Sequence, residues 1–440
     1  MATIGGYTQQ LSLLNKLNSR YSSATKHATA IATGNKVNSA SDDASVYSIG
    51  TKMGIRIGAL DQAASNTQTG SAMLKVADGA ASNTLDILKT MKERAIQAAS
   101  STAKDSDRAA IQKEFNQYID QITDNSLVEY NGMALMNGSY SSATQLTTQA
   151  YTNSSFSTDT AGDTKLTDLA GRSGDGMQIM STDTVTVSFV KDGKTYSTSY
   201  AAGDTTLEDI FKKANELGQD AGIGDVFDTD VGSTKDIGTD EYGAKKTTTD
   251  GENAITVKAA TAGKAGEIAG FNISVQTADG QERKSVNNAF NEFTESIGAA
   301  EDRGDNALTL QVGADASQSI KAGLGNLSAR ALGLQGSDGS FLSVGTAEDA
   351  QAAITVIDNA INKVLDQSTN VGALSSRLEY TYSNLTTESE NITASQTTLM
   401  SADLAKEITQ YTSDNILMQA AQAMLAQSYQ NSGWYLNLLK

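Results

Sequence analysis

The chain has 440 residues, of which 33 are Lys or Arg and 51 are Asp or Glu, so its formal net charge is −18. This length allows about three domains of ~150 residues each. A chain this acidic repels nucleic acid and anionic lipid, so we expect neither nucleic acid nor a membrane as a partner. With no cysteine and a single histidine in the sequence, disulfides, thiolate nucleophiles and zinc sites built on Cys or His clusters are excluded.

Proline is absent from the sequence, although an average usage of ~5% would give roughly 20 prolines. Because one interior proline costs a helix about 3 kcal/mol and kinks it, this absence favours long uninterrupted helices. No apolar run reaches the ~18 residues that would span a bilayer. The start of the sequence also lacks the basic, apolar and small-residue order of a cleavable signal, so we expect no cleaved leader.

The N-terminal part predicts amphipathic helices, because its apolar residues lie three and four apart. The first series is Leu14, Leu17, Tyr21, Ala24, Ala28 and Ile31. Gly34 and Asn35 are expected to end this helix, and Ser41 or Asp42 to cap the next one. The later series are Met53, Ile57, Leu60, Ala64 and Leu74, then, beyond Gly79, Leu85 and Leu88, and finally Ile111, Phe115, Tyr118 and Ile122.

From about 150 to 305 the sequence is rich in Gly, Thr, Ser and Asp and alternates like β-strands. Val185, Val187 and Phe189 alternate with polar neighbours, and Asp192 with Gly193 is a hairpin signal before a return strand. Thr205 with Glu208 predicts a capping box for a helix that ends at Gly218. Further strands are expected at 254–258 and 271–275, and a helix over 286–297. We interpret this region as an independent α+β insert.

Near the C-terminus, large aliphatic residues recur at every seventh position, at Ile357, Val364, Val371, Leu378, Leu385, Ile392 and Leu399. This repeat predicts one coiled-coil-like helix of roughly 45 residues. The residue three positions before each of these is polar or small at most places in the second half of the helix. The apolar stripe, or seam, is therefore narrower there. A break at 401–403 precedes a second stripe, which consists of Leu404, Ile408, Tyr411, Met418 and Leu425.

The predicted fold class is mainly α: a long coiled-coil-like helical bundle built from both chain ends, with a variable α+β outer insert. Long helices with narrow seams cannot bury themselves alone. For the inner segments, 45–130 and 350–395, we favour an antiparallel bundle within one chain. For 1–35 and 403–440 we favour packing between chains, because only two narrow stripes would be left to cover each other.

No sequence motif of a known catalytic or nucleotide-binding site is present, so we expect no enzyme, no cofactor and no metal. His27 is expected to be exposed or interfacial. Asp228 and Asp230 are not followed by the Glu that a calcium loop needs at its twelfth position, and helix capping explains Asp42 and Asp43. Trp434 is expected to be an apolar anchor, with recognition by a partner as the alternative.

Several stretches carry a specific resemblance: GNKVNSASDDAS at 34–45, YNGMALMNG at 130–138, LTLQVGADASQSI at 308–320, AQAAITVIDNAINKV at 350–364 and ADLAKEITQYTSDNILMQAAQAMLAQ at 402–427. In this order they resemble the motifs of bacterial flagellin, the subunit of the flagellar filament. The resemblance covers about 1–140 and 305–440. It implies a structural subunit that is exported unfolded by the flagellar type III system and polymerises into an extracellular filament for motility.

The resemblance also implies a division of the chain into five parts. These are an N-terminal inner-core helix (1–42), the N-terminal part of a shell bundle (43–148), a variable outer insert (149–305), the C-terminal part of the bundle (306–400) and a C-terminal inner-core helix (401–440). The inner-core packing residues are then expected to be Leu14, Leu17, Tyr21, Ile31, Leu404, Ile408, Tyr411, Met418, Leu425 and Trp434. The heptad series from Ile357 to Leu399 is expected to form the seam of the shell bundle.

The partners that the resemblance implies are other subunits, an export chaperone on the C-terminal segment, and filament cap and hook-junction proteins. In members that stimulate the host flagellin-sensing Toll-like receptor, an Arg, a Leu and a Glu occupy the positions of Thr90, Arg94 and Glu114. Only the Glu is retained here, so we expect weak receptor activation. The alternatives are a hook-filament junction protein of the same family, a flagellin-bodied surface adhesin, and a flagellin whose insert is an enzyme.

Overall fold

The computed structural model describes residues 2–438 and, within them, the side chains of residues 8–431. The chain divides into two compact units. One consists of the residues up to Thr67, Gln311–Gln318 and the residues from Tyr380 onwards, and the other consists of Gln68–Leu310 and Ser319–Glu379. Each unit therefore combines segments from both halves of the chain, as the predicted pairing of the two ends requires.

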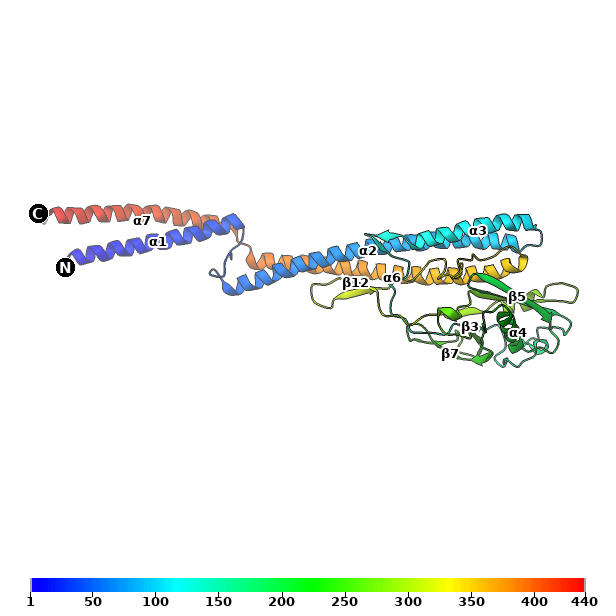
Figure 1. Ribbon diagram of the computed structural model, residues 1–440. Coiled ribbons are helices and arrows are strands. Elements are labelled where there is room, and N and C mark those ends of the chain that lie inside the picture. Colours follow the sequence, from blue (N-terminus) through cyan, green and yellow to red (C-terminus); the bar gives the residue numbers. More distant parts are fainter. Residues whose placement is uncertain (1, 439–440) are drawn as a thin grey trace. The chain divides into compact units, whose positions relative to one another are not determined.

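The first unit contains the two terminal helices. α1 (Ala2–Thr33) and α7 (Leu404–Leu438) lie side by side (Figure 1). α1 ends at Gly34, whose φ of 74° suits a glycine and whose N–H donates to the carbonyl of Ala30. An antiparallel bridge between Asn35 and Ser401 joins the segments beyond the two helices. The predicted stop at Gly34 and the predicted break at 401–403 are confirmed.

Two adjacent aspartates build the turn between α1 and α2 (Ala44–Ala99). The Asp42 carboxylate accepts hydrogen bonds from the backbone N–H groups of Asn38 and Ser39. The Asp43 carboxylate instead accepts from the first N–H groups of α2, at Ser45 and Val46, and so caps the helix. The predicted cap at Ser41 or Asp42 was wrong, because Asp42 is already used inside the turn.

The long helices α2 and α6 (Ala347–Met400) are unbroken. α2 continues through Gly79, and α6 is longer than the heptad repeat predicted. α3 (Asp105–Ser126) follows α2 after a short loop. The guanidinium of Arg108 donates to the carbonyls of Ala98 and Ser100, which have no intrahelical partner at the C-terminal end of α2.

Two short hairpins accompany the helices. They are formed by β1 (Glu129–Tyr130) with β2 (Met133–Ala134), and by β12 (Leu308–Gln311) with β13 (Ser319–Ala322). Asn131 and Gly132 connect the first pair with φ angles of 51° and 76°. Such angles are typical of a two-residue turn that matches the twist of the strands.

Between these hairpins, the insert contains three antiparallel sheets with the strand orders β10-β4-β5, β11-β3-β9-β6 and β7-β8. The strands are β3 (Ala150–Asn153), β4 (Thr184–Lys191), β5 (Lys194–Ala201), β6 (Gly232–Thr234), β7 (Asp236–Thr239), β8 (Lys245–Thr247), β9 (Ala254–Lys258), β10 (Gly270–Gln276) and β11 (Thr294–Ile297). The helices are α4 (Leu207–Asp220), α5 (Lys284–Phe290) and the single 3-10 turns Leu166–Asp168 and Lys264–Gly266.

The core of the insert is a cluster of aromatic rings. The Phe271 ring lies 5.1 Å from the ring of Tyr151 and 5.1 Å from that of Phe293. Phe271 and Phe189 face each other on the paired strands β10 and β4. Val185 and Val187 are buried in the same core, so the predicted alternation along this strand is confirmed.

Other predictions for the insert need correction by small amounts. The hairpin at Asp192 and Gly193 is confirmed, with φ angles of 50° and 72°. The capping box consists of Thr206 and Asp209, one residue later than predicted, because the Thr205 hydroxyl bonds to the carbonyl of Ala202. α4 also continues past Gly218 to Asp220.

The predicted helix over 286–297 was wrong in its second half. α5 ends at Phe290, and Thr294–Ile297 is strand β11, paired with β3. The apolar spacing at Phe290, Phe293 and Ile297 fits a helix, but here the backbone hydrogen bonds come from a strand that lies far away in the sequence. Tertiary pairing therefore overrides the local pattern.

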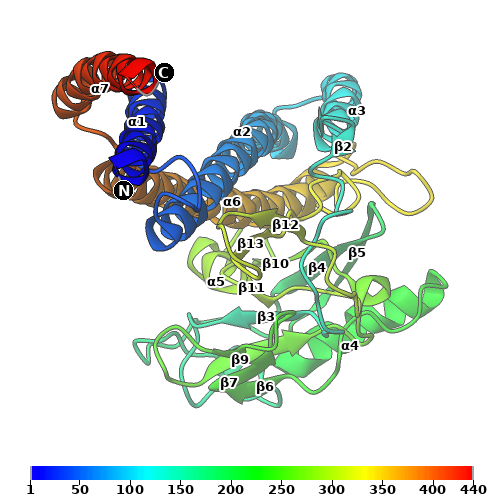
Figure 2. The same ribbon diagram turned by 90° about the vertical axis from the view of Figure 1, so that its left-hand side faces the viewer.

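The insert is not a compact unit of its own, contrary to our expectation. It shares a unit with α3 and parts of α2 and α6, and its strands gather on one side of α6 (Figure 2). A Cβ atom added at Gly270 would lie 3.0 Å from the backbone nitrogen of Val356 on α6. The start of β10 therefore approaches α6 so closely that a side chain at this position would force the helix or the strand to shift.

Candidate assembly surface

The pair of terminal helices leaves most of its large apolar side chains exposed to water. Leu14 is 40% and Tyr21 68% exposed on α1, and Leu404 is 47% and Ile408 51% exposed on α7. Of the other inner-core residues expected from the sequence, Tyr411 is exposed, and Leu17, Ile31, Met418 and Leu425 are half-buried. The side chain of Trp434 lies outside the side chains that the structure describes.

The pattern in the sequence missed further exposed apolar residues on the same helices. These are Leu11, Ile416, Leu417, Met424 and Tyr429. Ile416, Leu417 and Met424 fall outside the three-four spacing, so a search for one stripe does not find them. Leu11 and Tyr429 lie three residues before Leu14 and four residues after Leu425, where the predicted stripes could have been extended. The apolar surface therefore extends over more than one face of the pair, which is typical of helices that are enclosed by several neighbours.

Four ionisable side chains bridge α1 and α7. Arg20 Nη1 lies 2.9 Å from Asp414 Oδ1, and His27 Nδ1 lies 2.5 Å from Glu407 Oε2. The second ring nitrogen, His27 Nε2, is 3.8 Å from Asp414 Oδ2. His27 is half-buried between the two helices, which is the interfacial placement that we expected for it.

The heptad series of α6 lies largely in the helical bundle. Ile357, Val364, Val371, Leu378 and Leu385 are buried, and Ile392 and Leu399 are half-buried. Where the seam becomes polar, the polar residues have partners on α2: Ser368 donates to Asp78, Ser389 to Asp61, and Gln396 to the carbonyl of Gly50. Hydrogen bonds therefore supplement the narrow apolar seam, and a pattern of hydrophobicity alone does not show them.

The three positions that the resemblance led us to expect at receptor contacts lie on α2 and α3. Arg94 Nε is 3.1 Å from Glu114 Oε2, and the side chains of both residues are close to half exposed, at 43% and 47%. Thr90 Oγ1 donates to the carbonyl of Asp86 one turn earlier. The charged replacement at Arg94 is thus paired with the retained Glu114, a contact that the sequence did not reveal.

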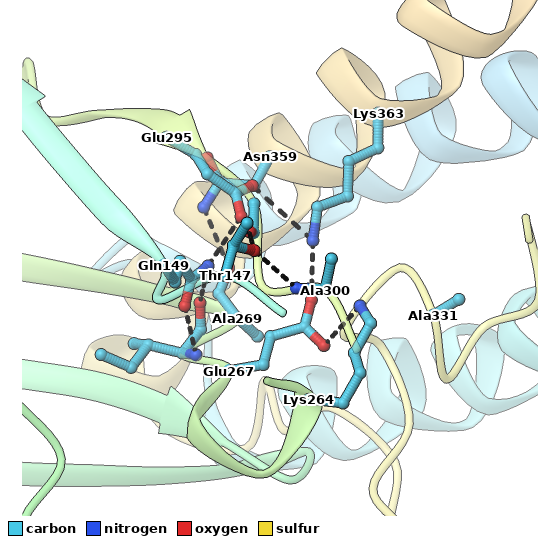
Figure 3. Close-up of polar contacts among 12 residues, drawn as sticks. Thr147, Gln149, Lys264, Glu267, Ala269, Glu295, Ala300, Ala331, Asn359 and Lys363 are labelled. Carbon is cyan, nitrogen blue, oxygen red and sulfur yellow. Dashed lines mark hydrogen bonds and ion pairs between the residues drawn. The ribbon is translucent and has the colours of Figure 1, made fainter. Parts of the chain in front are cut away.

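A polar cluster joins the insert to α6 (Figure 3). Lys363 Nζ on α6 lies 2.8 Å from Glu267 Oε1 and 3.6 Å from Glu295 Oε2. Both glutamates belong to the insert, and their side chains are 12% exposed. Lys264 reaches the other carboxylate oxygen of Glu267 at 2.9 Å. Two cations and two carboxylates therefore meet at the junction.

Neutral side chains complete this junction. Asn359, one turn before Lys363, donates to the carbonyl of Ala269 at 2.9 Å. The Gln149 side chain accepts a hydrogen bond from the N–H of Ile268 and donates to Glu295. In such a satisfied network each hydrogen bond is strengthened by the low local dielectric. Sequence patterns gave no indication of it, because its members are distant from one another in the chain.

The charges at the junction reinforce each other. Burial acts to raise the pKa of Glu267, but Lys363 and Lys264 outweigh it and hold this pKa below the ordinary 4.5. Burial likewise acts to lower the pKa of Lys363, but Glu267 and Glu295 outweigh it and hold this pKa above the ordinary 10.5. Both groups are therefore ionised at neutral pH, and each stabilises the charge of the other.

In the part of the chain that the structure describes, no group of three or more acidic or histidine side chains is placed to hold a metal ion. The Asp228 carboxylate accepts from the backbone N–H of Asp230 within a turn. None of the helices described is both long enough and apolar enough to cross a lipid bilayer.

Comparison with known proteins identifies the family. A sequence model of the bacterial flagellin N-terminal helical region matches residues 4–141, and one of the bacterial flagellin C-terminal helical region matches residues 354–439. A flagellin of Clostridium tyrobutyricum is 30% identical over 423 residues, which are 95% of this chain and 97% of that protein. The chain belongs to the bacterial flagellin family. This flagellin is therefore a structural subunit of the flagellar filament, and the resemblance inferred from its motifs is confirmed.

Other relatives agree with this assignment. Polar flagellin C of Vibrio parahaemolyticus is 26% identical over 419 residues, 93% of this flagellin and 92% of that protein. The flagellar filament 33 kDa core protein of Treponema phagedenis is 36% identical over 146 residues, 32% of this flagellin and 51% of that protein.

Solved structures of flagellar proteins are also similar to this chain. Flagellar hook-associated protein-3 of Legionella pneumophila has 12% identity and a TM-score of 0.33, with coverage of 79% of this flagellin and 98% of that chain. FliC of Burkholderia pseudomallei has 15% identity and a TM-score of 0.26, with coverage of 70% and 99%. At these TM-scores the likeness carries no argument about how this flagellin works.

Replacing Lys363 by Met tests the junction between the insert and α6. The variant leaves Glu267 and Glu295 without their cation on α6, so we expect the free energy of unfolding to fall by about 3 kcal/mol at pH 7. The matched control is Lys321→Met, which removes a lysine that is 63% exposed and pairs with Asp305. The control should change the free energy by less than about 1 kcal/mol. Urea unfolding followed by tyrosine fluorescence measures both.

The effect of Lys363→Met should depend on pH in a defined direction. Because folding lowers the pKa of Glu267, its contribution is complete above 4.5 and is lost as the pH falls through the lowered value. Because folding raises the pKa of Lys363, its contribution is complete below 10.5 and is lost as the pH rises through the raised value. The difference between the variant and the unaltered protein should therefore be constant from about pH 5 to about pH 10 and shrink in acid. A difference that grows in acid would contradict the ion-pair account.

Proposed function

We propose that the apolar surface of α1 and α7 forms the inner-core contact between subunits of the filament. The observation that carries this proposal is that Leu14, Tyr21 and Ile408 remain exposed although the two helices already lie against each other. Removing a large apolar side chain from water contributes about 1.5–3 kcal/mol. Neighbouring copies that cover this surface would supply the burial that one chain lacks.

We assign the remaining parts of the chain on the same basis. Segments 1–42 and 401–440 form the inner core, and 43–148 and 306–400 form the surrounding shell bundle. The burial of the heptad series from Ile357 to Leu385 supports a bundle that is complete within one chain. Segment 149–305 is the outer part, and its junction with α6 fixes it to the shell.

We also propose that the chain is exported unfolded by the flagellar type III system, with a cytoplasmic chaperone on its C-terminal segment. The sequence supports this route through two absences. Without cysteine, an unfolded chain enters an oxidising exterior without cross-linking. Without proline, a subunit folds at its destination without prolyl isomerisation, which takes tens of seconds. Filament cap and hook-junction proteins are the partners expected at the two ends of the polymer.

Replacing Ile408 by Ser tests the inner-core assignment. Ile408 is 51% exposed in the single chain, and losing roughly 1.4 kcal/mol of contact between subunits raises the critical concentration for polymerisation about tenfold. The matched control is Met180→Ser, because Met180 is 59% exposed but lies in the insert. Sedimentation of polymer from purified protein at raised salt measures the critical concentration.

Each result of this experiment decides between alternatives. A raised critical concentration for Ile408→Ser alone supports the inner-core assignment. If Ile408→Ser polymerises like the unaltered protein, the assignment is wrong. If the unaltered protein itself stays monomeric, the hook-filament junction protein becomes the better reading.

We propose that this flagellin activates the host flagellin-sensing Toll-like receptor only weakly. Arg94 carries a charge where stimulating members present an apolar contact, and its ion pair with Glu114 occupies the one retained contact residue. A receptor would have to separate this pair before it could bind Glu114. Thr90 cannot supply the positive charge of the Arg that it replaces.

Restoring two residues should restore activation. We expect Thr90→Arg combined with Arg94→Leu to increase potency about 30-fold, the effect of one contact worth about 2 kcal/mol. Reporter cells that carry the receptor measure the potency. Arg94→Ala is the control, because it releases Glu114 without adding either contact, and it should recover only a small part of the gain. Potency of the unaltered protein equal to that of a strongly stimulating member would contradict this proposal.

A further inference from the structure

The carboxylates between α1 and α7 are largely withdrawn from water. The Asp414 side chain is 6% exposed and that of Glu407 is 16% exposed, and both belong to α7. Their partners on α1 are Arg20 and His27. Removing carboxylates from water is costly unless they are paired. This cluster, which we call the charge clasp, therefore constrains how the two helices can lie.

The spacing of the charge clasp distinguishes one register from its neighbours. Arg20 and His27 are seven residues apart on α1, and Glu407 and Asp414 are seven residues apart on the antiparallel α7. A slip by one heptad keeps apolar residues facing apolar residues, because their own spacing is close to the same repeat. The slip nevertheless places Arg20 opposite Ala421 in one direction, or His27 opposite Met400 in the other. Only the observed register satisfies both carboxylates.

His27 lies between the two carboxylates of the clasp. The imidazole faces Glu407 and Asp414 on α7, and Arg20 on its own helix shares Asp414. Each carboxylate of the clasp therefore has a partner on α1.

We propose that the charge clasp of Arg20, His27, Glu407 and Asp414, together with the bridge between Asn35 and Ser401, sets the register in which α1 pairs with α7. The inference rests on the proposed inner-core role of the two helices, because a fixed register is what allows their exposed apolar residues to meet the same neighbours in every subunit.

Engineered cysteines read the register directly, because the sequence contains no cysteine. In the observed register the Gln10 side chain reaches the carbonyl of Ser428, so a short bismaleimide should cross-link Gln10→Cys with Ser428→Cys. Adding Arg20→Asp, which opposes Asp414 with a like charge, should reduce this cross-link at least about fivefold.

A charge exchange is the matched control for misfolding. Arg20→Asp with Asp414→Arg restores an opposite pair, and the cross-link at positions 10 and 428 should recover. If Arg20→Asp leaves that cross-link unchanged, or if the exchange does not restore it, the clasp does not set the register.

Polymerisation of the unaltered protein separates this inference from the proposed function. If the unaltered protein polymerises but its cross-link does not respond to Arg20→Asp, the register role of the clasp is wrong although the inner-core assignment stands. If the unaltered protein does not polymerise, the proposed inner-core function itself is wrong.

Discussion

The burial of apolar side chains between helices is the interaction on which the rest of this structure depends, and the terminal helices do not complete it. α2 and α6 bury the heptad series from Ile357 to Leu385 within one chain, so this part of the bundle is satisfied. α1 and α7 bury small residues such as Ala24 and Ala30 and leave Tyr21 and Ile408 in water. The proposed inner-core contact would use this asymmetry, because another copy can cover the surface that one copy leaves in water.

Polar interactions supply the specificity that narrow apolar seams lack. Along α6 the hydrogen bonds of Ser368 and Gln396 hold positions where aliphatic residues are missing. At the insert, Lys363 and Asn359 fix the sheets to the helix through directional contacts. Between α1 and α7, the Asp414 carboxylate lies close to both Arg20 and His27. In each place the apolar residues drive association, and the polar residues select one arrangement of it.

Much of this fold could be predicted from the sequence, because periodic spacing and turn chemistry are local signals. The heptads of α6, the stop at Gly34 and the hairpin at Asp192 are of this kind. Residues 294–297 were mispredicted because their backbone partners lie in β3, far away in the chain. The pairing of Arg94 with Glu114 and the cluster around Lys363 were missed for the same reason: a single sequence shows charges but not which of them meet. The predicted helix caps lay next to the observed caps at Asp43 and Thr206, because neighbouring polar residues compete for the capping position.

Amide hydrogen exchange of this flagellin, compared between monomer and filament, tests the central claim most directly. We expect amides in 11–31 and 404–425 to exchange at least about 100-fold more slowly in the filament than in the monomer, because neighbouring subunits then cover the exposed apolar surface of α1 and α7. Amides in the core strands of the insert, at 185–189 and 271–275, should exchange equally in both states. Equal exchange of the terminal helices in monomer and filament would contradict the account.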